Sequence, residues 1–231
     1  AGQLKFDPRG TAILLDALTA MELLGKDGGR YTLAPGAGEL LTGDSERSVA
    51  SMVLHLGNCL RNWEQLSRVV RSGQRADYRP SIRGVQAEKT SFIEAMNDIC
   101  RSAAPGLVEQ LGPPPFRHLL DIGAGPATWT IAFLQAAPDA RATVFDLPDV
   151  IPIAQRHVAA AGLTDRVEFV AGDFNQGDPL PTGADLAWVS AIVHMHSRHE
   201  NRPLFGRTRP ALADRRPILI RHLGMDAALH A

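Results

Sequence analysis

The sequence of 231 residues contains only two cysteines and has neither an excess of positive charge nor a long apolar run. Cys59 and Cys100 lie far apart, without the close spacing of a zinc site or a redox pair, which argues against a disulfide framework. We therefore expect a cytoplasmic protein with two buried, inert thiols. Because no apolar stretch approaches the roughly 20 residues that a membrane helix needs, we expect no membrane partner.

Charge is nearly balanced along the whole chain. The formal net charge is −1 and the pI is about 6.8. Nucleic acids attract proteins mainly through clustered Lys and Arg, and a balanced chain lacks the broad positive field that this requires. The composition therefore excludes a nucleic-acid partner and favours small molecules or other proteins.

Residues 11–35 predict a helix followed by a small hairpin. In TAILLDALTAMELLG, apolar side chains recur at helical spacing up to Gly25, where the helix is expected to end. The turn Asp27-Gly28-Gly29 and the alternating segment Tyr31 to Leu33 predict the hairpin, which completes the outline of a winged-helix unit. Residues 1–50 hold five basic and seven acidic side chains. This balance favours a dimerisation role over DNA binding.

Residues 45–71 have apolar side chains at helical spacing and predict further helix, which the stretch 72–84, rich in Pro, Gly and Arg, interrupts as a linker. One set of side chains on this helix could line an acceptor pocket, but a helical stripe of this kind favours simple core. The set comprises Met52, His55, Asn58 and Trp63.

From residue 118 the chain alternates between strands and helices. Strands are expected to begin near residues 118, 142, 167, 185 and 218, with a helical segment in each gap, which is the pattern of a parallel sheet covered on both faces. The predicted fold class is α/β, behind a mostly helical domain. We expect one domain over residues 1–84, including the linker, and a second over residues 85–231. Since the chain runs only to Ala231, we expect the second domain to be incomplete at its C-terminus.

A turn with two glycines joins the first of these strands to a helix in LLDIGAGPATWTIAFL, residues 119–134. Gly123 and Gly125 stand at the carboxyl end of the strand, where an open α/β sheet places its nucleotide-binding turn. A dinucleotide fingerprint requires a small residue at position 128, which is Thr128, so the pattern weakens a phosphate-binding interpretation. Taken alone, the glycine pair is equally consistent with a structural turn.

Acids end the next two strands. Asp146, followed by Leu147, ends ATVFD, where a carboxylate can accept hydrogen bonds from both hydroxyls of a ribose. Asp173 and Phe174 follow VEFVAG and supply an acceptor for an adenine amino group and an aromatic face beside the ring. Because the carboxyl ends of parallel strands meet at one edge, these residues together predict a nucleoside site.

The segment Asp121 to Ala127, D-x-G-x-G-x-A, resembles the first motif of class I S-adenosylmethionine-dependent methyltransferases, which usually has glycine at the last place. With the strand ends and the N-terminal helix and hairpin, nearly the whole chain is similar to the small-molecule O-methyltransferases of plant phenolics and bacterial polyketides. The resemblance implies a Rossmann-like methyltransferase sheet behind a winged-helix dimerisation domain and a homodimer. It also implies S-adenosylmethionine as cofactor and an aromatic or polyketide-like hydroxyl as acceptor.

The resemblance further implies roles for single residues. Phe92 and Met96 match a Phe-x-x-x-Met helix that lies against cofactor and acceptor, and Lys89 matches a basic residue that reaches the cofactor's carboxylate. His194 matches the catalytic histidine, whose neutral imidazole can take the proton of the acceptor hydroxyl, and Ser190 lines the cofactor. The implied cofactor-binding set is Lys89, Asp121, Gly123, Gly125, Asp146, Leu147, Asp173, Phe174 and Ser190.

Two positions depart from the family's pattern and leave alternatives open. Met195 follows the histidine where Asp is frequent, and Arg221 with His222 stands on the fifth strand where an acid is usual, so no carboxylate is identified that would orient His194. One alternative is therefore an S-adenosylmethionine-binding winged-helix regulator or an inactive homologue. Another is a nicotinamide-dependent oxidoreductase, against which Thr128 argues.

A metal site is a further interpretation of the segment after the fourth strand. His194, His196 and His199 lie close in sequence, but neither Cys nor an acid joins them at ligand spacing. We therefore predict no metal.

Overall fold

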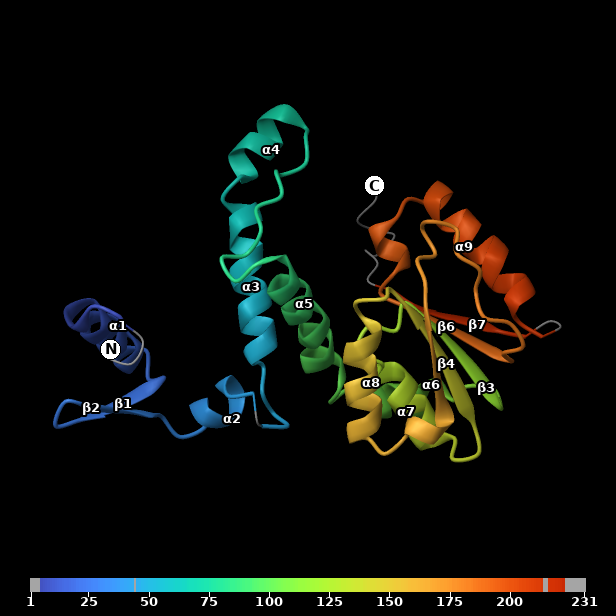
Figure 1. Ribbon diagram of the computed structural model, residues 1–231, viewed down its shortest axis with the longest axis horizontal. Coiled ribbons are helices and arrows are strands. Elements are labelled where there is room, and N and C mark those ends of the chain that lie inside the picture. The colour runs from blue at the N-terminus through green and yellow to red at the C-terminus, as the bar shows by residue number, and fades with distance from the viewer. Residues whose placement is uncertain (1–4, 44, 214–215, 223–231) are drawn as a thin grey trace.

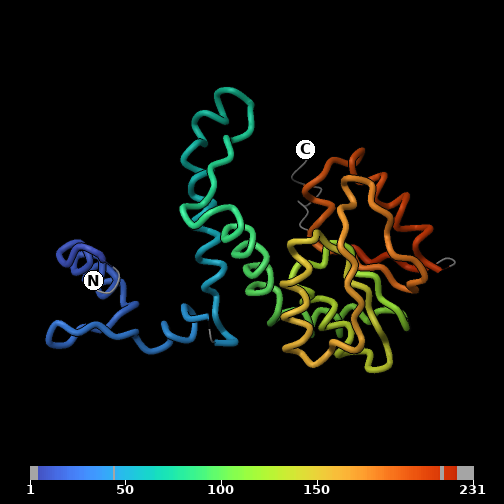
Figure 2. Tube along the Cα trace, viewed as in Figure 1, coloured from blue at the N-terminus to red at the C-terminus, as the bar shows by residue number. Residues whose placement is uncertain are grey.

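The computed structural model describes residues 5–43, 45–213 and 216–222. Figure 1 shows an extended N-terminal region, a pair of crossing helices, and an α/β region that contains the larger sheet. In Figure 2 the trace of the first helix and the hairpin joins the remainder through a single run of chain. The predicted α/β class is confirmed.

The N-terminal region begins with helix α1 (Pro8–Ala20), which the Asp7 carboxylate caps by accepting a hydrogen bond from Gly10 N at 2.7 Å. The expected hairpin is present as β1 (Leu24–Asp27) and β2 (Arg30–Leu33), with Gly28 and Gly29 at positive φ in the turn. The expected helix end at Gly25 is wrong, because Leu24 and Gly25 pair with β2 instead. The helix stops at Ala20, and α2 (Ala37–Leu41) follows the hairpin. The winged-helix assignment stays a prediction.

Four helices connect this region to the sheet: α3 (Ala50–Trp63), α4 (Leu66–Ser72), α5 (Val85–Cys100) and α6 (Ala104–Leu111). Residues 73–84 contain no helix, and the domain boundary at this stretch stays a prediction. Helices α3 and α5 pack against each other. The expectation that the stripe on α3 is core is wrong: every residue of this helix is described and none is buried, and Trp63 is 66% exposed.

The larger sheet has five parallel strands in the order β5-β4-β3-β6-β7. Its strands are β3 (His118–Ile122), β4 (Arg141–Asp146), β5 (Val167–Ala171), β6 (Leu186–Ser190) and β7 (Ile218–Arg221), which confirms the five expected strands. From β3 the order proceeds to β4 on one side and to β6 on the other. Such a reversal opens a crevice outside the carboxyl ends of the strands.

Helices cover both faces of the sheet (Figure 1). Side chains of α6, α7 (Thr128–Ala136) and α8 (Ile151–Ala160) form one core layer with Phe133 at its centre, and α9 (Arg198–Ala211) packs on the opposite face through Leu204. Short 3₁₀ turns, η1 (Thr164–Arg166) and η2 (Val193–Met195), precede β5 and follow β6. The two layers fix the sheet edge on which the site is built.

One expected helix does not form. Residues 172–185, all of them described, contain no helix, so the expectation of a helical segment in every gap is wrong there. Gly177, Pro179, Pro181 and Gly183 lie within this stretch, and both residue types oppose helix formation. The chain crosses from β5 to β6 as an irregular connection.

Two remaining expectations concern the chain's surroundings. The expectation of an incomplete C-terminus falls on residues 223–231, which lie outside the described residues. Within the three described ranges, no helix combines the length and apolar character that a membrane span requires.

Candidate active site

A cavity of about 630 Å³ lies at the carboxyl edge of the sheet, beneath α5. Of the twelve site residues that the sequence predicts, all but Lys89 line it. These eleven are Phe92, Met96, Asp121, Gly123, Gly125, Asp146, Leu147, Asp173, Phe174, Ser190 and His194. Side chains from four strand ends and one helix therefore meet in one place.

The glycine turn after β3 forms the floor of the cavity. Gly123 has φ +69°, and a Cβ there would lie 2.6 Å from Ile192 Cδ1, so a side chain at this position would collide with the core. Gly125 has φ +57°, but a Cβ there would meet no protein atom within 4 Å. The first glycine is required by packing, whereas the second leaves open space where a ligand can approach the backbone.

Asp146 holds this turn in place. Its Oδ2 accepts a hydrogen bond from Gly125 N and its Oδ1 accepts one from Leu147 N, both at 2.7 Å. Burial raises the pKa of the Asp146 carboxyl, while these two N–H groups act in the opposite direction. The carboxylate is therefore a bridge between β4 and the glycine turn as well as an acceptor facing the cavity, and the sequence did not show this bridge.

Asp121 is 1% exposed and lies at the inner end of the same turn. Its Oδ2 accepts a hydrogen bond from Thr130 Oγ1 at 2.6 Å, which links β3 to α7. Burial, together with the negative charge of Asp146, raises the pKa of Asp121 to about 7, although the hydrogen bonds from Thr130 act in the opposite direction. The cavity thus contains a carboxyl group that exchanges a proton near neutral pH.

Asp173 and Phe174 form the far wall beyond β5. Asp173 Oδ1 accepts a hydrogen bond from Asn175 N, and Asp173 N donates to Asp178 Oδ2, both at 2.8 Å. The Phe174 ring meets the His196 ring edge to face, with centroids 6.3 Å apart. These contacts fix an acid and an aromatic face side by side at the place that the sequence predicts for adenine.

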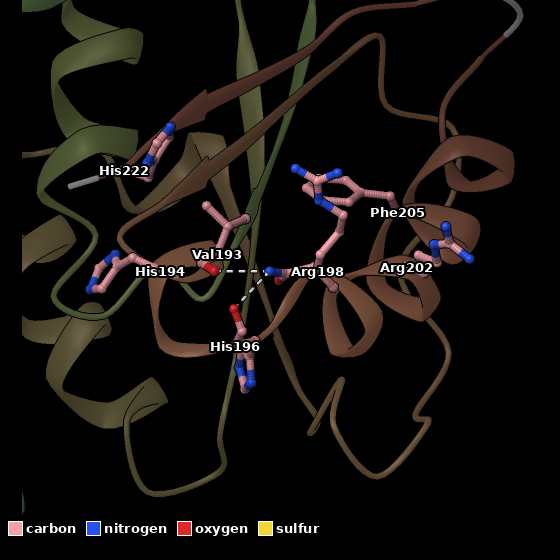
Figure 3. Close-up of a pocket in the computed structure, with 8 residues that line it drawn as sticks. Val193, His194, His196, Arg198, Arg202, Phe205 and His222 are labelled. Atoms are coloured by element: carbon pink, nitrogen blue, oxygen red, sulfur yellow. Dashed lines mark hydrogen bonds between the residues drawn. The ribbon is translucent and has the colours of Figure 1, made fainter. Parts of the chain in front are cut away.

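His194 lies in η2, directly after β6, and its side chain is exposed at the rim of the cavity. Asn201 fixes this segment, because its Nδ2 donates to Val193 O at 2.8 Å and to His196 O at 3.2 Å (Figure 3). In the part of the chain that the structure describes, no carboxylate is hydrogen-bonded to His194. The orienting acid that the sequence failed to identify is therefore not found among these residues either.

A second, more open hollow of about 690 Å³ adjoins the rim and shares His194 and His196 with the cavity. Figure 3 shows its other side chains, which come from η2, from α9 and from the residue after β7. They are Val193, Arg198, Asn201, Arg202, Phe205 and His222. No acid lines this hollow among the described residues.

Helix α5 forms the roof of the cavity through Phe92 and Met96. Polar contacts attach it to the α/β region: Asn97 Oδ1 accepts from Thr128 Oγ1 at 2.7 Å, and Glu94 binds Arg156 at 2.9 Å and His157 at 2.6 Å. Lys89 belongs to these contacts, because its Nζ lies 2.6 Å from Asp149 Oδ2. Its hydrogen bond to Asp149 raises the pKa of Lys89, and its place in the structure is outside the cavity lining.

Sequence reasoning missed Trp129, and it placed Arg221 only as a departure from an expected acid. Both line the cavity, with the Arg221 guanidinium carbon 4.9 Å from the Trp129 ring centroid. The sequence signal that could have identified them is their position, since Trp129 lies at the start of a helix and Arg221 at the end of a strand. Cys100 also lines this side; burial raises the pKa of its thiol, and the charge of Arg221 acts against that rise.

Metal ligands do not gather at this edge. The described ranges contain no group of three or more His, Cys, Asp or Glu side chains placed to hold a metal ion. The arrangement instead combines a glycine turn, acids on neighbouring strand ends, aromatic and apolar walls, and a histidine at the rim. Such a site can hold a nucleoside on one side and an apolar ring on the other.

Known proteins are similar to this chain in sequence and in fold. A family model described as an O-methyltransferase domain matches residues 66–228. The chain is 29% identical over 231 residues to the 3-hydroxy-5-methyl-1-naphthoate 3-O-methyltransferase of Streptomyces sahachiroi, covering 98% of this chain and 67% of that protein. It is 31% identical over 202 residues to the acetylserotonin O-methyltransferase of Bos taurus, covering 81% and 58%.

A solved structure with the same fold is human N-acetylserotonin methyltransferase in complex with SAM, with a TM-score of 0.72 and 23% identity over 95% of this chain and 67% of that chain. The chain thus spans about two thirds or less of the length of these relatives. The family match covers more than half of the sequence. The chain belongs to the O-methyltransferase domain family.

Proposed function

We propose that this protein is an S-adenosylmethionine-dependent O-methyltransferase that acts on a hydroxyl of an aromatic or polyketide-like small molecule. One observation carries the proposal: the glycine turn, Asp146 and Asp173, which end three neighbouring strands, line the same cavity as His194 and the apolar roof of α5. Family membership supports the chemistry, and the named relatives methylate a naphthoate and acetylserotonin.

The cofactor fits the acidic half of the cavity. Asp146 has lone pairs remaining after its two backbone hydrogen bonds, and these would accept the ribose hydroxyls. Asp173 and Phe174 would hold the adenine, while the open space at Gly125 admits the methionyl chain against the backbone. S-adenosylmethionine, when bound there, supplies a methyl group that its positive sulfur activates towards nucleophiles.

The acceptor would lie between α5 and the rim. Phe92 and Met96 offer it an apolar surface, and His194, at the rim, would take the proton from the acceptor oxygen on a ring nitrogen. Positioning is the larger contribution, because holding the two reacting atoms in contact replaces a bimolecular encounter with an intramolecular step. Asn201 supports it by fixing the backbone on both sides of His194.

Cofactor binding tests the first half of the proposal. Isothermal titration should detect S-adenosylhomocysteine at the micromolar level, and Asp146→Ala should weaken it about 10- to 100-fold, since hydrogen bonds to a charged group contribute roughly 1.5–3 kcal/mol each. Asp16→Ala removes an acid that pairs with Lys26 near the hairpin and should leave affinity unchanged. Absence of binding to the wild type would refute the cofactor assignment.

Methyl transfer tests the second half. With a panel of hydroxylated aromatic acceptors and chromatographic detection of S-adenosylhomocysteine, His194→Ala should lower kcat about 100-fold or more while cofactor affinity stays the same. His199→Ala, on α9 outside both hollows, is the matched control. An unaltered rate in His194→Ala would remove this residue as the base.

A second candidate function is an S-adenosylmethionine-binding protein without catalysis. The observation that favours it is the lack of a carboxylate beside His194 in the described part of the chain, where Met195 follows directly. The same two experiments separate the candidates. Cofactor binding without turnover of any acceptor in the panel would favour the second.

We also propose a homodimer built through the N-terminal region, in the cytoplasm. Exposed apolar side chains on α1 and α3, including Ile13, Leu56 and Leu60, support an interface with a second copy. Cys59 and Cys100 are free thiols, which supports a reducing compartment.

A further inference from the structure

The edge of the sheet is acidic on one side and basic on the other. Asp121 and Asp146 lie at the ends of β3 and β4, and Asp173 follows β5, on the side proposed for the cofactor. On the side of β6 and β7 the charged group that lines the cavity is Arg221, next to Ser190 in the parallel register. The two halves of the cavity therefore suit ligands of opposite charge.

Arg221 is held in a fixed position with hydrogen-bonding capacity to spare. Its guanidinium carbon lies 4.9 Å from the centroid of Trp129, and Nη1 donates a long hydrogen bond of 3.4 Å to Ser190 Oγ. Among the described residues it forms no salt bridge and no other side-chain hydrogen bond. Contact with an aromatic ring leaves the edge of a guanidinium, which has five N–H donors, free for a planar anion.

The surroundings of Arg221 increase the effect of its charge. Met96, Ile99 and Ile192 line the same cavity, and its side chain is only partly exposed. A cation beside apolar walls interacts with an anion more strongly than in water, and it is destabilised when unpaired. The adjoining hollow contributes Arg198, Arg202 and His222 and no described acid (Figure 3), so the approach to this half is also basic.

We propose that the methyl acceptor is an aromatic acid and that Arg221 binds its carboxylate. This inference rests on the proposed function and adds the charge of the acceptor to it. A carboxylate on a planar ring matches the guanidinium fork, and pairing the two fixes the ring between α5 and the rim. Arg221 is then the residue that selects acids over neutral phenols.

Binding of a matched pair of ligands tests the proposal. The full chain is saturated with S-adenosylhomocysteine and titrated with 3-hydroxy-2-naphthoate and with 3-hydroxy-2-naphthamide, which have the same ring and hydroxyl but differ in charge. The acid should bind at least about tenfold more tightly than the amide, and this preference should shrink between 50 and 500 mM NaCl. Equal affinities, or no binding of the acid, would overturn the proposal.

Substitutions locate the effect at Arg221. Arg221→Gln should reduce the preference to within about twofold while S-adenosylhomocysteine affinity stays within about threefold, and Arg221→Lys should retain part of the preference. Arg216→Gln removes the same charge just before β7, outside both hollows, and should retain all of it. A preference that survives Arg221→Gln contradicts the assignment.

The controls separate this inference from the proposed function. If S-adenosylhomocysteine does not bind the wild type, the proposed function fails. If it binds and the acid and amide are not distinguished, only the role of Arg221 fails. Should Arg221→Gln lose cofactor binding through misfolding, the wild-type pair and Arg221→Lys still decide the outcome.

Discussion

The N-terminal region and the helices α3 and α4 that follow it leave apolar side chains exposed, whereas the α/β region buries them. All residues of α1, α3 and α4 are described and none is buried, and Leu60 and Val70 are 62% and 75% exposed. In β6, by contrast, all five residues are buried, and its neighbours β3 and β4 are nearly as well covered. The α/β region has a hydrophobic core of its own, whereas the helices before it carry apolar side chains that the rest of the described chain leaves exposed.

This contrast shows where each region obtains its stability. Burial of apolar surface contributes roughly 25 cal/mol per Å², so helices that bury little gain little from folding alone. The α/β region can fix a site because both faces of its sheet are covered. The exposed apolar side chains of the N-terminal region support the dimer interface proposed above, and three comparisons test the contrast between the regions.

The largest effect is expected at the proposed dimer interface. Leu56→Asp with Leu60→Asp puts two charges on exposed positions of α3. Each charge should cost about 2 kcal/mol or more in an apolar contact, so the dissociation constant of the dimer should rise on the order of 1000-fold. Light scattering after gel filtration would show the mass fall by half. The matched pair Leu107→Asp with Leu111→Asp, at the same spacing on α6, should leave the mass unchanged. A monomeric wild type would contradict the interface.

A smaller effect is expected from alanine at two glycines of similar backbone conformation. Gly123→Ala combines a left-handed residue, which costs roughly 1–2 kcal/mol, with a collision against Ile192, which costs roughly 1–3 kcal/mol. Gly28→Ala in the hairpin has the first cost alone, since no atom lies within 4 Å of its Cβ. Urea unfolding should therefore show the greater loss in Gly123→Ala, together with weaker S-adenosylhomocysteine binding. Equal losses of unfolding free energy in the two variants would show that the contact with Ile192 contributes nothing to the difference.

The smallest effect concerns two ion-paired acids. Burial raises the pKa of Glu94, but its bonds to His157 and Arg156 outweigh this and lower the pKa below 4.5. A lowered folded-state pKa stabilises the protein above the unfolded value, and this contribution is lost as the pH falls through the folded value. Glu94→Gln should therefore cost about 1 kcal/mol at pH 7, and this cost should disappear as the pH falls through the lowered folded-state pKa.

Melting temperatures from pH 3.5 to 7 would measure this difference. Asp16→Asn, which breaks a fully exposed pair with Lys26 on the N-terminal region, is the matched control and should change the profile little. A Glu94→Gln profile parallel to that of the wild type would mean that this contact does not tie α5 to the α/β region.

The strand pattern and the acids at strand ends could be predicted because they follow from two regular properties. Parallel strands buried on both faces have continuous apolar runs, and their carboxyl ends lie at one edge, so Asp146 and Asp173 could be placed together without coordinates. His194 and Ser190 required the family resemblance, since a single histidine after a strand has no distinctive spacing.

The features that could not be predicted depend on contacts of long side chains and on a choice between helix and strand pairing for the same residues. The role of Lys89 at the cofactor stays a prediction, and its hydrogen bond to Asp149, sixty residues away in sequence, could not be read from the sequence. The end of α1 depended on pairing between Leu24 and Leu33, a contact that no helical pattern contains. Ala127 adopts φ 61° and is fully buried, an arrangement that glycine would adopt more easily and that the alanine in the sequence does not suggest.

The bridge that Asp146 forms to Gly125 has a consequence for how a nucleoside is received. The protein's own hydrogen bond between Asp146 and Gly125 shapes the loop over which the ligand would lie, so less conformational entropy remains to be lost on association. Binding of the nucleoside then adds contacts to a surface whose shape does not have to change. The part of the cavity that can still adapt is its roof, helix α5, because polar side-chain contacts set the distance of this helix from the sheet.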